Sequence, residues 1–85
     1  MQRKRSPVAI AAGKLILALQ KERAEQKVVD RAHTLLQAAH RASASSLLDG
    51  RSVAEYLDPV WVKMHPAVEP SIVALVAAMS AHENV

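Results

Sequence analysis

The sequence contains no cysteine and no phenylalanine, and it has only one tyrosine, one tryptophan and two glycines. The absence of cysteine excludes disulfides, thiolate catalysis and cysteine-ligated zinc, and it favours a cytoplasmic location over a secreted one. With so few aromatic side chains, the core must be built from small aliphatic residues at close helix–helix distances. The scarcity of glycine leaves no glycine-rich loop that could hold a phosphate.

The length of 85 residues allows one domain at most. We therefore expect a single helical domain over residues 1–85, with residues 1–6 as a flexible basic arm. A chain of this size buries roughly 60–65% of the surface that its unfolded form exposes, so its stability is marginal. Because disulfides cannot add stability, association of two chains is the usual remaining source of buried area. The sequence thus predicts a homodimer.

Charge is distributed unevenly along the chain. The first 27 residues carry seven basic and two acidic side chains, whereas the rest carry four basic and six acidic ones. Such asymmetry is typical of a contact with nucleic acid or an anionic surface, although a short basic arm is also common as a solvated tail. The candidate phosphate contacts are Arg3, Lys4, Arg5, Lys14 and Lys21.

Two apolar runs imitate targeting segments. The first follows the basic N-terminus, as in a secretion signal, but Lys14 interrupts it and no small-x-small cleavage pattern follows Leu19. The second, residues 71–79, is well short of the ~20 residues that a membrane span needs. We expect a soluble protein without a signal peptide or membrane contact.

The N-terminal half raises the question of one helix or two. Ser6 followed by Pro7 predicts a helix start, since serine is a good N-cap and proline suits the first helical position. The stretch over residues 20–27 has no glycine or proline and is rich in helix formers, which favours one long helix of ~55 Å over 37 residues. A rod of that length would almost require a dimer.

Hydrophobic phase favours the other reading. The apolar line of the first segment consists of Val8, Ala12, Leu15, Ile16 and Leu19, and that of the second of Val28, Ala32, Leu35, Leu36 and Ala39. On one straight helix these lines would lie on nearly opposite sides, so they could not bury against one neighbour. A turn or sharp kink within residues 20–27, which forms a helical hairpin, resolves the conflict. We favour this hairpin slightly.

The C-terminal part has clearer signals for where helices begin and end. Gly50 resembles a helix stop, and Ser52 with Glu55 has the spacing of a capping box that opens a short helix over 53–57. Asp58 and Pro59 predict a second short helix that ends at His65, before Pro66. The last helix, over residues 72–82, is apolar almost all round. Such a helix is normally central and packed on several sides.

These elements predict an all-α fold. We expect a small bundle of four to five helices, with two long N-terminal helices, or one long kinked helix, followed by short C-terminal helices. In the first helix, Ala9 and Gly13 form a small-xxx-small pair. A glycine inside a helix costs ~1 kcal/mol, which suggests that a close backbone contact uses it, in the same chain or in another copy.

No constellation of residues indicates catalysis or a cofactor. His33 and His40 share a helix face, but seven residues place them ~10 Å apart along the axis, with only Gln37 at the middle turn. No nucleophile elbow or carboxylate pair is present, since capping accounts for Glu55 and Asp58. We expect no enzyme activity, no metal and no cofactor.

Protein binding fits more of the sequence. The candidate contacts are the large side chains between Gly50 and Pro66 and the polar face of the second helical segment: Tyr56, Trp61, Met64, His33, Gln37 and His40. An alternative is that Trp61 fills the core. We expect a non-enzymatic adaptor or inhibitor that occupies a surface of a partner protein. The second hypothesis is a small nucleic-acid-binding regulator that uses the basic N-terminal third.

Overall fold

The structure, a computed structural model, describes residues 7–82, which form six α-helices and one 3₁₀ helix without any strand. The all-α prediction is therefore confirmed for these residues, and the predicted arm over residues 1–6 lies outside them. One helix more than predicted is present, because residues 44–48 form a separate turn of helix. The elements are α1 (Pro7–Lys21), α2 (Gln26–His40), α3 (Ala44–Leu48), α4 (Val53–Leu57), α5 (Pro59–Met64), η1 (Pro66–Val68) and α6 (Glu69–His82).

The N-terminal half is a helical hairpin and not a rod. α1 begins at Pro7 as predicted, and a turn over residues 22–25 reverses the chain before α2. The reversal brings both apolar lines to the inside, so the argument from hydrophobic phase is confirmed. Of the two lines, all but the half-buried Leu36 are buried: Val8, Ala12, Leu15, Ile16, Leu19, Val28, Ala32, Leu35 and Ala39.

Both long helices of this hairpin end in a Schellman motif without glycine. After α1, the amide of Ala24 donates to the carbonyl of Leu19 at 2.9 Å, and Arg23 takes a left-handed φ of 58°. After α2, the amide of Ser43 donates to Ala38 at 2.8 Å, and Ala42 has a φ of 56°. Glycine usually holds this position. Its absence explains why the sequence shows no stop signal at either end.

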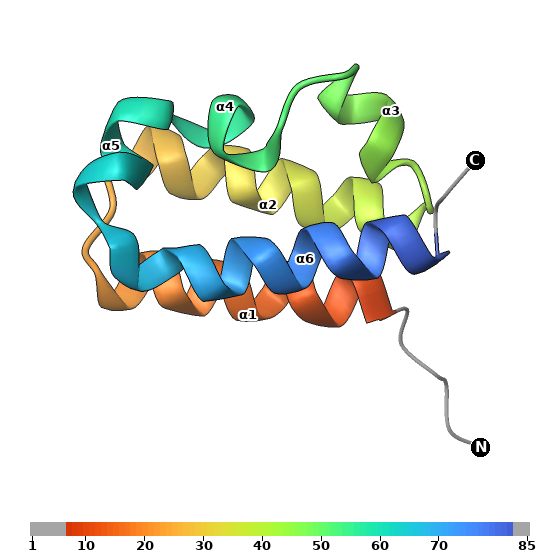
Figure 1. The fold of residues 1–85 in the computed structure, drawn as a ribbon, viewed down its shortest axis with the longest axis horizontal. Coiled ribbons are helices and arrows are strands. Elements are labelled where there is room, and N and C mark those ends of the chain that lie inside the picture. The colour runs from red at the N-terminus through yellow and green to blue at the C-terminus, as the bar shows by residue number, and fades with distance from the viewer. Residues whose placement is uncertain (1–6, 83–85) are drawn as a thin grey trace.

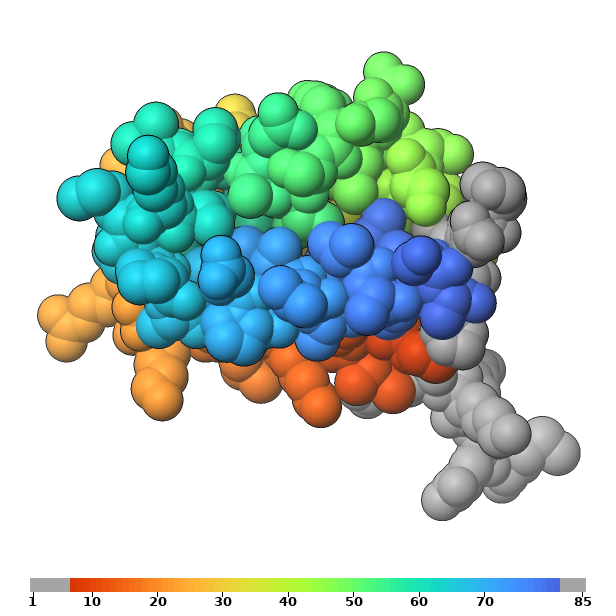
Figure 2. Space-filling view, viewed as in Figure 1, coloured from red at the N-terminus to blue at the C-terminus, as the bar shows by residue number. Residues whose placement is uncertain are grey.

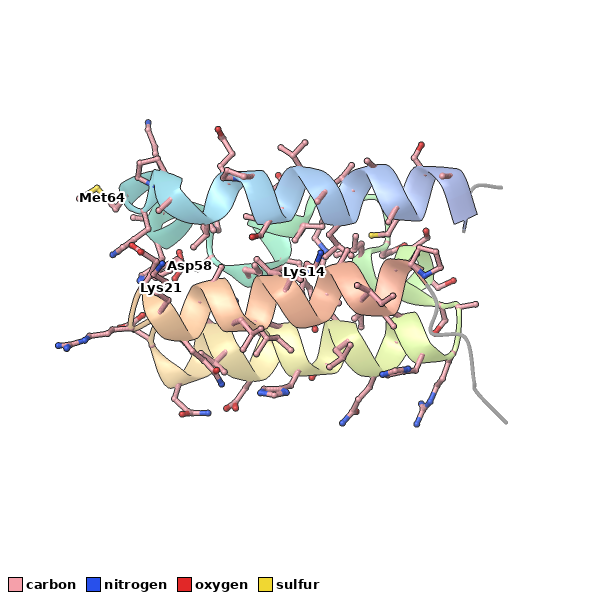
Figure 3. All side chains as sticks on the ribbon, turned by 90° about the horizontal axis from the view of Figure 1, so that it is seen from below. Lys14, Lys21, Asp58 and Met64 are labelled. Atoms are coloured by element: carbon pink, nitrogen blue, oxygen red, sulfur yellow. The ribbon has the colours of Figure 1, made fainter. Side chains whose placement is uncertain are left out.

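The helices form a bundle with α1 in the middle of one side. α1 packs against α2 and against α6, while α4 packs against both α2 and α6 and so helps to close the opposite side. Figure 1 shows α6 beside α1, with α3, α4 and α5 along the far edge. Seen from below, α1 runs between α6 and α2 (Figure 3). The outer side of α1 is therefore uncovered by other helices.

Local caps determine the short helices. Ser52 and Glu55 form the predicted capping box. The Glu55 amide donates to the Ser52 hydroxyl oxygen at 3.1 Å, and the Ser52 amide donates to the Glu55 carboxylate at 2.9 Å. Asp58 caps α5 by accepting from the amides of Val60 and Trp61, each at 3.1 Å. Pro59 occupies the first turn. Both predicted starts are confirmed, because each depends on side chains within three residues of the helix end.

α6 differs from the predicted last helix in its first residue and in its place in the bundle. It begins at Glu69 rather than at residue 72, and with 14 residues it is nearly as long as the N-terminal helices rather than short. It is also not central. Ile72, Leu75 and Met79 are buried, but Val73 is 60% exposed. Figure 2 shows α6 uncovered along one face of the molecule. Its main neighbours are α1, α4 and η1, which leave this face of the helix open.

Candidate protein-binding surfaces

The most exposed large apolar side chains in the described part of the chain lie on α5. Val60 and Met64 are each 72% exposed, and their spacing of four residues puts them on one face of the helix. Met64 lies at one end of the bundle in Figure 3. We call these two residues the α5 tip. Met64 was a predicted contact, whereas Val60 was missed, although its position one turn before Met64 is a readable signal.

The α5 tip is mounted on a well-held helix. At its start, Asp58 provides the cap, and its other carboxylate oxygen lies 3.8 Å from the Lys27 ammonium of α2. At its end, the ring of His65 stacks on Trp61, with centroids 4.0 Å apart and planes at 14°. The His65 Nδ1 also hydrogen-bonds to the Trp61 carbonyl at 2.9 Å. Both ends of this short helix are therefore secured by side chains.

Trp61 serves the core and the surface together. Its indole is half-buried and packs against the core, and its ring also carries His65. It is thus neither a fully buried core residue nor an exposed anchor. Trp61 lies three residues before Met64, a spacing that makes two side chains neighbours on a helix surface, so the accessible part of its ring adjoins the α5 tip.

Tyr56 is held within its own chain. Its side chain is half-buried against the core, and the Arg51 guanidinium lies 5.5 Å from the ring centroid, in cation–π range. Arg31 of α2 donates to the Leu57 carbonyl at 2.9 Å and fastens α4 to α2. These contacts occupy Tyr56 in tertiary structure. Less of it is available for a partner than of Met64.

The predicted polar face of α2 is exposed but divided. His33, Gln37 and His40 all lie at the surface. His40 borders a groove towards α1, whereas Gln37 borders a separate depression together with Arg41. The three residues therefore do not converge on one point. The depression beside Gln37 is lined mostly by polar side chains, and neither histidine borders it.

The groove between α1 and α2 has a volume of about 450 Å³. Its exposed apolar walls are Ile10, 41% exposed, and Leu17, 65% exposed, neither of which was a predicted contact. Gly13 lies between them, and a Cβ built there would meet no atom within 4 Å. The expected close backbone contact at Gly13 is therefore not made inside this chain. The groove is lined by Ala9, Ile10, Gly13, Lys14, Leu17, Leu36 and His40.

The basic candidates are only partly described. Lys14 and Lys21 are exposed on α1, two turns apart, and Figure 3 shows Lys14 near the middle of that helix. Within residues 7–82, the ion pairs are those of Lys27 with Glu25, at 3.7 Å, and with Asp58. Neither Lys14 nor Lys21 is engaged in one. The other three candidates, Arg3, Lys4 and Arg5, lie outside the described residues.

The described part of the chain holds neither a metal-binding cluster nor a membrane-spanning helix. Across residues 7–82, no three His, Asp or Glu side chains gather as a metal site would require. In the same range, no helix combines the length and the apolar character that crossing a bilayer demands. Comparison of the chain with models of protein families, with curated proteins and with solved structures finds no match. The exposed surfaces are therefore the basis for a functional proposal.

Proposed function

We propose that the protein is a non-enzymatic interaction module, an adaptor or inhibitor that works by covering a surface of a partner protein with its α5 tip. The observation that carries this function is the pair Val60 and Met64, each 72% exposed on the same side of one helix. Fully burying a side chain of this kind is worth about 1.5–3 kcal/mol. These two side chains supply exposed apolar area, and the half-buried Trp61 adds a residue type that is common in binding hot spots.

The rigidity of α5 supports this role. A segment that is already ordered loses little conformational entropy on binding, so more of the contact energy remains as affinity. Asp58, Pro59 and the stack of His65 on Trp61 order the helix before any partner arrives. Met64 retains side-chain freedom, which lets it adapt to an irregular surface. The α5 tip thus combines a fixed backbone with an adaptable anchor.

The test compares the α5 tip with an equally apolar site elsewhere. Wild-type protein, Val60→Glu, Met64→Glu and the matched control Leu17→Glu would each be immobilised and used to capture proteins from a cell extract. A protein captured by wild type and by the control would then be purified and titrated by calorimetry. We expect both α5 variants to bind it at least ~30-fold more weakly. Equal affinities in folded variants would contradict the use of this surface.

Trp61→Ala and Tyr56→Ala extend the same titration. Trp61 adjoins the α5 tip, so its truncation should weaken binding, whereas Tyr56 is occupied by Arg51 and should matter less. Circular dichroism would verify that each variant remains folded. If both variants bind the purified partner as wild type does, these two residues are not contacts.

A second function is supported by the basic side of α1. We infer that α1 could contact nucleic acid without sequence specificity, because Lys14 and Lys21 are exposed and have no ion-pair partner among the described residues. Such binding should weaken steeply with salt, and replacing each lysine by glutamine should reduce the slope of log K against log salt by about one. A shallow slope, unchanged in Lys14→Gln and Lys21→Gln, would remove this candidate.

A further inference from the structure

α6 presents an apolar side that nothing in the described structure covers. One side of this helix contacts the core through Ile72, Leu75 and Met79. On the other side, Val73 and Val76 are 60% and 46% exposed, and small residues surround them. Figure 2 shows this helix in full view on one face of the molecule. The α6 outer face consists of Val73, Ala74, Val76, Ala77, Ser80 and Ala81.

The α6 outer face carries no charge. Between Glu69 and His82 the sequence has no acidic, basic or histidine side chain. The exposed side of α2, in contrast, carries several such groups, including Asp30, Arg31 and His33. A helix that is apolar on all sides normally buries all of them. The outer face of α6 is therefore an apolar surface that a partner could cover.

The lack of charge points to the kind of partner. A nucleic acid or an acidic peptide needs cations, and the α6 outer face has none to offer. A second copy of the same chain has no such requirement. In a two-fold contact the residues nearest the axis meet their own counterparts, so a charge close to the axis would repel its copy. A face without charges is complementary to itself.

The residue sizes agree with this partner. Ala74, Ala77 and Ala81 lie on the exposed side at intervals of three and four residues, so they allow two helix axes to approach to about 8 Å. A two-fold axis perpendicular to the helices makes them antiparallel, which also opposes their dipoles favourably. We propose that the chain forms a homodimer through the α6 outer face, with the two α6 helices antiparallel about a two-fold axis.

The expected affinity is modest. A helix of 14 residues is ~21 Å long and with its side chains about 10–12 Å wide, so the contact falls below the ~800 Å² per partner of a standard interface. The dimer should therefore dissociate on dilution. The α5 tip is a separate surface, so this dimer does not depend on the proposed partner contact.

Sedimentation equilibrium of the full chain over a range of concentrations tests the dimer. Ala77→Glu places a carboxylate on each copy near the middle of the contact, while glutamate remains a good helix former at an exposed site. We expect its dimer dissociation constant to rise at least ~100-fold, because facing like charges are strongly unfavourable. Val60→Glu and Leu17→Glu add the same charge at other exposed apolar sites and should leave the constant within about threefold of wild type.

Three outcomes would overturn this interface. Wild-type protein that sediments as a monomer at every concentration has no such dimer. A dimer that persists in Ala77→Glu uses another surface. A dimer lost in Leu17→Glu but kept in Ala77→Glu lies in the groove between α1 and α2. Val60→Glu keeps the two proposals apart, since it should lose the partner protein and retain the dimer.

Cysteine cross-linking tests the orientation. Because the chain has no cysteine of its own, single substitutions of Ala74, Ala77 or Ala81 by cysteine report one contact each. A disulfide needs Cβ atoms about 3.5–4.5 Å apart. In an antiparallel pair only the residue nearest the axis meets its counterpart, so one position should cross-link much faster than the other two. Equal rates at all three would indicate parallel helices and would contradict the two-fold arrangement.

Discussion

α2 and α6 have nearly the same length, 15 and 14 residues, and both lie against α1. They differ in how their apolar residues are arranged. In α2 these residues form one stripe, and that stripe is the buried side. In α6 apolar residues occur all round the helix, and only part of them are buried. An amphipathic sequence therefore selects its buried side by itself, whereas a uniformly apolar one leaves the selection to its neighbours.

The ends of the two helices show the reverse difference. α2 follows a turn that contains the left-handed Arg23 and ends before the left-handed Ala42, both without the usual glycine. α6 follows Pro66 and has Pro70 in its first turn, so its beginning is marked in the sequence. The buried side of α2 is thus locally encoded, and the start of α6 is marked to within three residues, since it lies at Glu69 and not at the predicted residue 72. The ends of α2 and the side of α6 are not locally encoded.

The largest expected effect of this difference between α2 and α6 is on the cost of removing a buried leucine. Leu35 of α2 and Leu75 of α6 are both 0% exposed. Leu35→Ala should lower the free energy of unfolding by about 4–5 kcal/mol and Leu75→Ala by about 2–3 kcal/mol. α6 can turn slightly and bring Val76 inward to fill the cavity, whereas turning α2 would bury polar side chains. Urea unfolding followed by circular dichroism measures both, with equal m-values as the control. Equal losses would show that α6 is held as firmly as α2.

A smaller test addresses the end of α2. Ala42 has a φ of 56°, which is unfavourable for a residue with a Cβ. Ala42→Gly should raise the free energy of unfolding by about 0.5–1 kcal/mol, because relief of this strain exceeds the added flexibility of the unfolded chain. The matched control, Gln37→Gly at an exposed position within α2, should lower it by about 1 kcal/mol. A loss of stability in both variants would mean that Ala42 is not left-handed in solution.

The smallest effect on stability is expected at the exposed sides. His33→Gln in α2 and Val73→Gln in α6 should each change the free energy of unfolding of the monomer by less than about 0.5 kcal/mol, since both positions are exposed. Dilute thermal unfolding measures this change. The two variants should differ in sedimentation, where only Val73→Gln weakens the dimer. A large loss of monomer stability in Val73→Gln would instead indicate that α6 buries this side within its own chain.

Much of the fold could be predicted where the signals are local. Pro7, the pair Ser52 and Glu55, and the pair Asp58 and Pro59 open their helices as expected, because each cap involves residues at most three apart. The hairpin followed from hydrophobic phase, although the turn itself has no typical turn residue. The separate helix α3 was missed. The chain between His40 and Ala44 turns at Ala42, a residue that normally favours helix continuation.

The candidate surfaces were less predictable than the fold. Met64 was expected as a contact and is exposed, but Tyr56 and Trp61 are each half-buried against the core, and their rings also contact Arg51 and His65. Leu17 and Val73 gave no sequence signal of exposure, because an aliphatic residue is exposed only when no other element packs over it. That condition depends on the arrangement of the whole bundle.

The sequence alone determined where the capped helices begin and which sides of α1 and α2 are buried. These features depend on hydrogen bonds to nearby amides and on a hydrophobic period within a single helix, both of which act over a few residues. Only the tertiary structure decided where α1 and α2 end, which half of α6 meets the core, and that Val60 and Met64 stay exposed together. Those outcomes depend on which distant segments come into contact, and an apolar side chain has no directional preference among them.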